Sequence, residues 1–133
     1  MAYLLDTCAL SDYLKGELNT VKRFHQAKPH DVSLSSITVF EIDYGLQLKP
    51  SLRKQLNAQL QAIYRKVQII DFSPTEAKVA AKVRSNLKQA GTPIGYYNLL
   101  IAATAKVHNL TVVTSNTREF SRVIDLKLEN WRL

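Results

Sequence analysis

Short apolar runs alternate along this chain with longer segments in which apolar residues recur every three or four positions. Runs of the first kind predict buried strands, and segments of the second kind predict amphipathic helices. Strands are expected at residues 2–5, 32–35, 67–70, 110–114 and 126–129, and helices at 8–14, 19–28, 36–49, 52–64, 74–90 and 98–107.

This order of elements predicts an α/β fold, a three-layer α/β/α sandwich with a central, mostly parallel sheet covered on both faces. No repeat, linker or low-complexity stretch divides the chain, so residues 1–133 are expected to form a single domain. The helix at 98–107 is apolar on nearly all sides and should therefore lie buried between layers. Ser73, Pro74 and Glu76 together form a strong helix start.

The charge of the chain adds a candidate partner to this fold. A formal net charge of +7, from 18 Lys and Arg against 11 Asp and Glu, favours a polyanion such as nucleic acid or an acidic protein. Many soluble domains are basic without such a partner, so charge alone is weak support. The first residues show no basic region followed by an apolar core, so no secretory signal is expected, and no apolar run reaches the roughly 20 residues that a membrane helix needs. The single cysteine, Cys8, fits a reducing cytoplasm, and a small buried thiol is expected there.

Several common functional motifs are absent. The four glycines form neither a dinucleotide-binding G-x-G-x-x-G pattern nor a Walker loop, which argues against a nucleotide-dependent enzyme. The three histidines show no spacing typical of metal ligands, and each is interpreted as a surface or cap residue.

Polar residues follow the predicted strands at the places where parallel sheets build sites. Asp6 follows the first strand, Glu41 lies early in the helix after the second, and residues 114–119 follow the fourth. Because sites in such sheets lie beyond the carboxyl ends of the strands, these residues are expected to converge. Asn98, on the first turn of the central helix, is expected at the same place.

Each of these acids also has a simpler interpretation. Asp6 can be the N-cap of the following helix, Glu41 can lie on an exposed helix face, and Glu119 can pair with Arg118 or Arg122. Their joint arrival at one sheet edge favours a site. Crowded carboxylates repel each other unless they are protonated or neutralised, and Mg²⁺ prefers such oxygen ligands. A metal held there can activate water and stabilise charge on a phosphodiester.

Four segments in order carry a resemblance to a known family. They are Leu4-Leu-Asp-Thr7, Ser35-Ser-Ile-Thr-Val-Phe-Glu-Ile-Asp-Tyr-Gly45, Gly91-Thr-Pro-Ile-Gly-Tyr-Tyr-Asn-Leu-Leu-Ile-Ala-Ala103 and Val113-Thr-Ser-Asn-Thr-Arg-Glu-Phe-Ser-Arg-Val123. These segments resemble the motifs of VapC-type toxins, which are PIN-domain ribonucleases of bacterial toxin–antitoxin pairs. The resemblance extends from Tyr3 to Trp131.

The resemblance implies a PIN fold, RNA cleavage dependent on Mg²⁺ or Mn²⁺, a homodimer, and inhibition by a VapB-type antitoxin in a hetero-oligomer. It also implies a cytoplasmic protein without a membrane partner. Relatives with the Thr-Arg-Glu-Phe sequence include ones that cut tRNA in the anticodon loop, which makes tRNA the expected substrate.

Position by position, the resemblance implies roles for individual residues. Asp6 matches the first metal carboxylate, Glu41 the second, and Asn98 the place of a third acid that is normally aspartate. Glu119 matches an additional acid. The catalytic set is thus Asp6, Glu41, Asn98 and Glu119, the metal ligands are Asp6, Glu41 and Asn98, and Thr7, Thr114 and Asn116 take supporting positions.

Asn98 is the departure with the largest chemical effect. Asparagine is neutral and carries an NH₂ donor where the family has a second acceptor oxygen. Either the residue was substituted so that a toxic nuclease could be produced, which we favour, or the natural protein has a weakened site. A simple helix cap is a further interpretation. The expectation is therefore an inactive or weakened ribonuclease, with a silent RNA- and antitoxin-binding module as the alternative.

Overall fold

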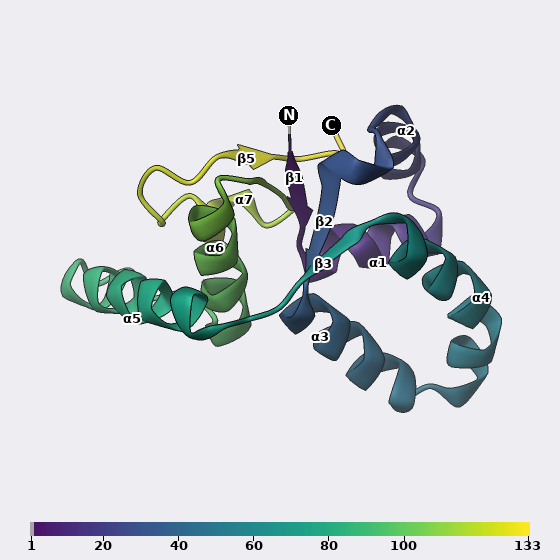
Figure 1. Ribbon diagram of the computed structural model, residues 1–133, viewed down its shortest axis with the longest axis horizontal. Coiled ribbons are helices and arrows are strands. Elements are labelled where there is room, and N and C mark those ends of the chain that lie inside the picture. Colours follow the sequence, from purple (N-terminus) through teal and green to yellow (C-terminus); the bar gives the residue numbers. More distant parts are fainter. Residues whose placement is uncertain (1) are drawn as a thin grey trace.

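The computed structural model describes residues 2–133, in which five short strands form one fully parallel sheet (Figure 1). The strands lie in the order β3-β2-β1-β4-β5, so the first strand of the chain is central. Leu5 pairs with Leu34 of β2 and with Val113 of β4, so these three strands end level with one another. The bounds are β1 Tyr3–Leu5, β2 Val32–Ser35, β3 Gln68–Ile70, β4 Thr111–Val113 and β5 Leu128–Glu129.

Helices cover both faces of the sheet, as the sequence predicted (Figure 1). Helices α1, α2, α4 and most of α3 lie on one side, and α5, α6 and α7 lie on the other. The bounds are α1 Thr7–Lys15, α2 Leu18–Gln26, a 3₁₀ turn Pro29–Asp31, α3 Ser36–Gln47, α4 Pro50–Lys66, α5 Pro74–Gln89, α6 Tyr96–His108 and α7 Thr117–Phe120.

Alternation along the strands divides the apolar core between the two faces. Leu5 and Val113 pack with α1 to α4, whereas Leu4 and Val112 pack with α5 and α6. Successive residues of a strand point to opposite faces, so β1 and β4 each supply both cores. The predicted α/β/α sandwich is confirmed.

The central helix α6 is buried as expected. Ile101, Ala102, Ala103, Thr104 and Ala105 are all at most 1% exposed. Its N-cap is Gly95, so the interpretation of Asn98 as a simple helix cap is wrong. Asn98 instead lies inside the first turn, where its side chain is free to act on neighbouring elements.

The helix starts differ in detail from the sequence-based prediction. Ser73 and Glu76 form the predicted capping box. Helix α3 begins at Ser36, as predicted, with Ser35 as its cap, whereas α4 begins at Pro50, two residues before the predicted start at 52. Proline is favoured at the first position of a helix, so Pro50 marks a helix start.

Two apolar residues lie further out than predicted. Cys8 is exposed rather than buried, because α1 turns it away from the sheet. Phe40, expected on the buried side of α3 with Ile42 and Leu46, is 49% exposed. Only Ile42 and Leu46 of that stripe reach the core.

The C-terminal segment is held against α1 and α2. The guanidinium of Arg132 donates hydrogen bonds of 2.7 and 2.8 Å to the two carboxylate oxygens of Asp12, and Trp131 is buried. Asn19 donates a hydrogen bond of 2.7 Å to the carbonyl oxygen of Arg132. Within residues 2–133, no helix is both long enough and apolar enough to span a bilayer.

Candidate active site

Asp6 lies directly beyond the carboxyl end of β1 and begins α1. Its Oδ1 accepts a hydrogen bond of 2.8 Å from the backbone N–H of Ala9, so Asp6 is the helix N-cap as well as a candidate ligand. The residue is 1% exposed. Burial raises the pKa of Asp6 to about 6, against the hydrogen bonds from Thr114 and Ala9, and the charges of Asp12 and Glu41 raise it further. An ionised carboxylate is therefore costly here in the metal-free protein.

Glu41 approaches Asp6 from α3. The hydroxyl of Thr7 donates a hydrogen bond of 2.6 Å to Glu41 Oε1, and it lies 3.4 Å from the hydroxyl of Thr38. Because Thr7 follows Asp6 directly, this bond ties the second carboxylate to the start of α1. Glu41 is half-buried and does not lie on an exposed helix face, the simpler interpretation of this residue.

Glu119, on the short helix α7, accepts hydrogen bonds from three directions. Its Oε1 receives the backbone N–H of Gly95 at 2.6 Å and Asn98 Nδ2 at 3.1 Å, and its Oε2 receives Asn116 Nδ2 at 3.1 Å. The pKa of Glu119 is lowered, first by the Gly95 N–H, then by the amides of Asn98 and Asn116 and the charge of Arg122. Glu119 is therefore ionised and held in one position.

Gly95 is a residue of this site that the sequence analysis did not single out. A Cβ at this position would lie 3.3 Å from Glu119 Oε1, closer than most such contacts. The absence of a side chain lets the carboxylate reach the backbone N–H at the N-terminus of α6. The signal in the sequence is a glycine immediately before a helix.

Thr114 and Asn116 connect the two halves of the site. The Thr114 hydroxyl hydrogen-bonds to Asp6, which lowers the pKa of that carboxyl, and accepts the backbone N–H of Asn116 at 2.9 Å. The Asn116 side chain then reaches Glu119. A continuous set of polar contacts thus runs from the end of β1, through the segment after β4, to α6 and α7.

Comparison with known proteins identifies the family. A model of the PIN domain matches residues 3–126. The chain belongs to the PIN-domain family. Among its relatives is ribonuclease VapC2 of Rickettsia felis, 36% identical with 98% of each chain covered. The tRNA(fMet)-specific endonuclease VapC of Shigella flexneri is 28% identical, again with 98% of each chain covered.

A solved structure agrees with the sequence relatives. VapBC2 from Rickettsia felis, bound to a DNA fragment from its promoter, superposes with a TM-score of 0.89 and 31% identity, covering 98% of this chain and 99% of the other. The resemblance to VapC-type PIN domains predicted from the four sequence segments is therefore confirmed.

The donor set of this PIN domain fits a hard divalent cation. Asp6 and Glu41 supply carboxylate oxygens, and in residues 2–133 neither of them, nor Glu119, forms an ion pair with a lysine, arginine or histidine. A buried carboxylate without a cationic neighbour is relieved by a bound cation. Within the same residues, no three Asp, Glu, His or Cys side chains are close enough to hold one ion together. At most two acids therefore serve one ion.

Asn98 accounts for part of this shortage of acids. Its Nδ2 points at Glu119, so the amide takes the orientation of a hydrogen-bond donor to a carboxylate. An aspartate at this position would present a second carboxylate beside Glu119 in place of that donor. The carboxylates at positions 98 and 119 would then attract a cation, because no hydrogen bond between them would balance their charge.

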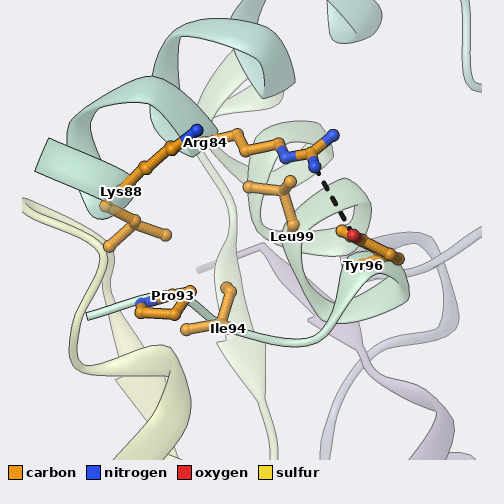
Figure 2. A pocket seen from close by; sticks show the side chains of 7 residues that line it. Arg84, Lys88, Pro93, Ile94, Tyr96 and Leu99 are labelled. Carbon is orange, nitrogen blue, oxygen red and sulfur yellow. Dashed lines mark hydrogen bonds between the residues drawn. The ribbon is translucent and has the colours of Figure 1, made fainter. Parts of the chain in front are cut away.

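Positive charge lies beside the site, where α5 passes the start of α6. A cavity of about 270 Å³ lies here, lined by Arg84, Lys88 and Tyr96, among others. Figure 2 shows these side chains. The Arg84 guanidinium lies 4.9 Å from the centre of the Tyr96 ring and 3.5 Å from its hydroxyl. Tyr96 follows Gly95, so this cationic surface adjoins the acidic residues and suits a polyanionic chain that passes across them.

Proposed function

We propose that this PIN domain is the toxin of a type II toxin–antitoxin pair and a metal-dependent endoribonuclease that acts on tRNA in the cytoplasm. The observation that carries the proposal is that Asp6 and Glu41 come together at one sheet edge with no cationic partner among the described residues. A net charge of +7 around an acidic centre suits a reaction on a polyanion.

Each site residue has a role in this proposal. Asp6, Glu41 and the carbonyl oxygen of Asn98 hold the ion, Mg²⁺ or Mn²⁺. A divalent cation, when bound, lowers the pKa of water and stabilises negative charge on the phosphodiester. Glu119 orients a water molecule or the side chain of Asn98 through its hydrogen bonds. The supporting residues act on these acids: Thr7 fixes Glu41, Thr114 hydrogen-bonds Asp6, and Asn116 fixes Glu119.

The choice of tRNA rests on the relatives. The VapC of Shigella flexneri, matched over 98% of this chain, is named a tRNA(fMet)-specific endonuclease. Cleavage of the anticodon loop fits the same chemistry, because bases in a loop are unstacked and accessible to a shallow site.

A VapB-type antitoxin is the proposed protein partner, and a homodimer the proposed assembly. The similar structures from Rickettsia felis and Salmonella typhimurium are both VapBC complexes bound to DNA. A cationic side chain from the antitoxin would satisfy Asp6 and Glu41 in the same way as a metal ion, which gives a physical reason for inhibition.

The second candidate function is a silent module that binds RNA and antitoxin without turnover. The observation in its favour is the hydrogen bond between Asn98 and Glu119, which satisfies both groups without a cation. In this case the protein retains the fold and its basic surface, and RNA binding is independent of metal.

Cleavage of a purified tRNA mixture distinguishes the ribonuclease from the silent module. Asn98→Asp is compared with the unchanged protein across a Mg²⁺ titration, with Asn86→Asp on the exposed face of α5 as a charge-matched control. We expect Asn98→Asp to cleave at least about tenfold faster, with activity lost in EDTA, because charge stabilisation by a metal typically has this size. Equal rates of the two proteins at every Mg²⁺ concentration, or cleavage that persists in EDTA, would contradict the proposal.

A further inference from the structure

A second cavity lies between helices α3 and α4, beside the site that contains Glu41. Its volume is about 290 Å³. The two helices run from the sheet edge and back as an arm of the molecule (Figure 1). The lining includes Phe40 and Asp43 from α3 and Arg53, Asn57 and Tyr64 from α4. The cavity thus combines two aromatic rings with hydrogen-bond donors and acceptors and with side chains of both charges, which is the composition of a site for a polar, planar ligand.

Tyr64 carries an unsatisfied polar group in this cavity. Its hydroxyl oxygen is buried and has no hydrogen-bond partner within residues 2–133. A buried hydroxyl without a partner costs free energy, so such groups are rare unless a ligand or water completes them. Burial raises the pKa of Tyr64, and the charge of Asp43 raises it further, so the hydroxyl stays protonated and can donate.

Exposed aromatic rings connect this cavity to the acidic site. Phe40 is 49% exposed and Tyr97 is 46% exposed, and their ring centres lie 5.4 Å apart at an angle of 65°. On the other side, the Tyr44 ring lies 6.5 Å from Phe40 and nearly parallel to it. Glu41 follows Phe40 directly, and Asn98 follows Tyr97 directly. The aromatic row therefore borders both the cavity and the acids.

We infer that the α3–α4 cavity binds one unpaired nucleobase of the RNA, with Phe40 stacked on its face and Asp43 and Tyr64 contacting its edge. This inference rests on the proposed function. Unpaired bases in RNA are recognised by stacking on aromatic side chains and by hydrogen bonds to their edges. Arg53 supplies positive charge for the adjoining phosphate. The base beside the cleaved bond would thereby fix which phosphate meets Asp6 and Glu41.

The charge of Asp43 sets an order of preference among bases. A carboxylate accepts a hydrogen bond from the exocyclic amino group of cytosine, whereas uracil presents a carbonyl oxygen at the same place. The cavity should therefore favour cytosine over uracil, two bases of equal size. A cavity that binds a peptide side chain has no reason to prefer cytosine over uracil. A measured preference for cytosine therefore indicates RNA, rather than a protein, as the occupant.

Binding in EDTA tests the inference independently of cleavage. The probes are a fluorescently labelled oligocytidine and an oligouridine of equal length, titrated with the unchanged protein and with Phe40→Ala, Asp43→Asn and Tyr64→Phe. The matched controls are Leu18→Ala, Asp125→Asn and Tyr13→Phe, which lie outside the cavity. Phe40 and Asp43 are exposed, so their variants should fold, and thermal melting verifies this.

We expect the unchanged protein to bind oligocytidine about fivefold more tightly than oligouridine, the size of one net hydrogen bond. Phe40→Ala should weaken both by about tenfold, within the range for losing one stacked base. Asp43→Asn should abolish the preference for cytidine, and Tyr64→Phe should weaken oligocytidine binding by about threefold. The three controls should match the unchanged protein.

Two results would overturn the inference. The first is equal affinity of the unchanged protein for the two probes, and the second is unaltered RNA affinity of Phe40→Ala. A change in the oligomeric mass of Phe40→Ala that accompanies the second result would show that the aromatic row is a protein contact. If the unchanged protein binds neither probe, the cavity inference fails, and the proposed ribonuclease function is then decided by tRNA cleavage alone. If the cavity variants do not alter RNA affinity but Asn98→Asp still cleaves tRNA, only the cavity inference is wrong and the ribonuclease function is retained.

Discussion

The amide nitrogen of Asn98 donates a hydrogen bond of 3.1 Å to the carboxylate of Glu119. The bond joins the first turn of α6 to α7, and Gly95 adds a second donor to the same oxygen. In this arrangement the charge of Glu119 is satisfied by the protein itself. The residue at position 98 thus decides whether the site is stable without a cation.

The first prediction concerns the stability of Asn98→Asp. Without metal, the variant loses a hydrogen bond and gains a like charge beside Glu119, so its Tm in EDTA should fall by about 4 °C, equivalent to roughly 1 kcal/mol. Saturating Mg²⁺ should raise the Tm of the variant more than that of the unchanged protein, because a ligand stabilises only the state that binds it. Thermal melting with and without Mg²⁺ measures both effects. An equal rise for both proteins would show that position 98 does not contact the ion.

The second prediction concerns Asp6, whose pKa is raised to about 6, chiefly by burial. At neutral pH the buried Asp6 carboxylate is ionised, and this charge lowers the stability of the folded protein. Asparagine at the same position carries no charge and still accepts the N–H of Ala9 as an equally good N-cap. In EDTA at pH 7, Asp6→Asn should be more stable by about 3 kcal/mol, since the folded and unfolded pKa values, about 6 and 3.8, differ by about two units and one unit corresponds to about 1.4 kcal/mol. The difference should shrink as the pH falls through about 6 and vanish below the unfolded value of 3.8. Urea unfolding across this range tests it, and a less stable variant at pH 7 would contradict it.

The third prediction concerns the orientation of Glu41 by Thr7. Thr7→Val keeps the shape of the side chain but removes the 2.6 Å hydrogen bond to Glu41. In the Asn98→Asp background, tRNA cleavage should fall by about tenfold, the size seen when a ligand loses a supporting hydrogen bond. Thr7→Ser keeps the hydroxyl and should retain most of the activity. A similar loss in both variants would mean that packing, rather than the hydrogen bond, is what matters.

The fourth prediction concerns acid stability and lies away from the site. Hydrogen bonds from Ser73, the largest cause, and from His108 lower the pKa of Glu76 to about 2 against the cost of its burial. The His108 Nε2 lies 2.8 Å from Glu76 Oε2. Stability that depends on this carboxylate is present above pH 4.5 and is lost as the pH falls toward 2. Glu76→Gln should flatten unfolding free energy against pH in that range, because glutamine keeps a capping partner without titrating. An unchanged pH profile of the variant would disprove the assignment.

The sequence predicted the sheet edge well because strand ends are marked by single residues. Asp6 follows an apolar run, Thr114 and Asn116 follow another, and parallel strands must bring these positions together. The position of Asn98 followed from the change of pattern at the start of a strongly apolar segment. Each of these residues is marked by its immediate neighbours in the sequence, and the parallel order of the strands predicts that they meet. The structure brings the same residues together.

Other parts of the site depend on contacts that no local pattern records. Glu119 reaches Gly95 because a four-residue helix, α7, turns it back toward α6, and so short a helix has no periodicity to detect. Phe40 belongs to an apolar stripe, yet the neighbouring helix α4 covers only part of that stripe. Cys8 is small and apolar, which says nothing about the direction in which α1 exposes it.

The central position of β1 has a consequence for how the protein is made. Its neighbour β4 and Glu119 of α7 are synthesised long after β1, and Arg132 meets Asp12 across 120 residues of chain. A partly translated polypeptide therefore carries Asp6 and Glu41 without the groups that assemble around them. Under the proposed function, the ribonuclease becomes competent only after the ribosome has synthesised the chain through α7.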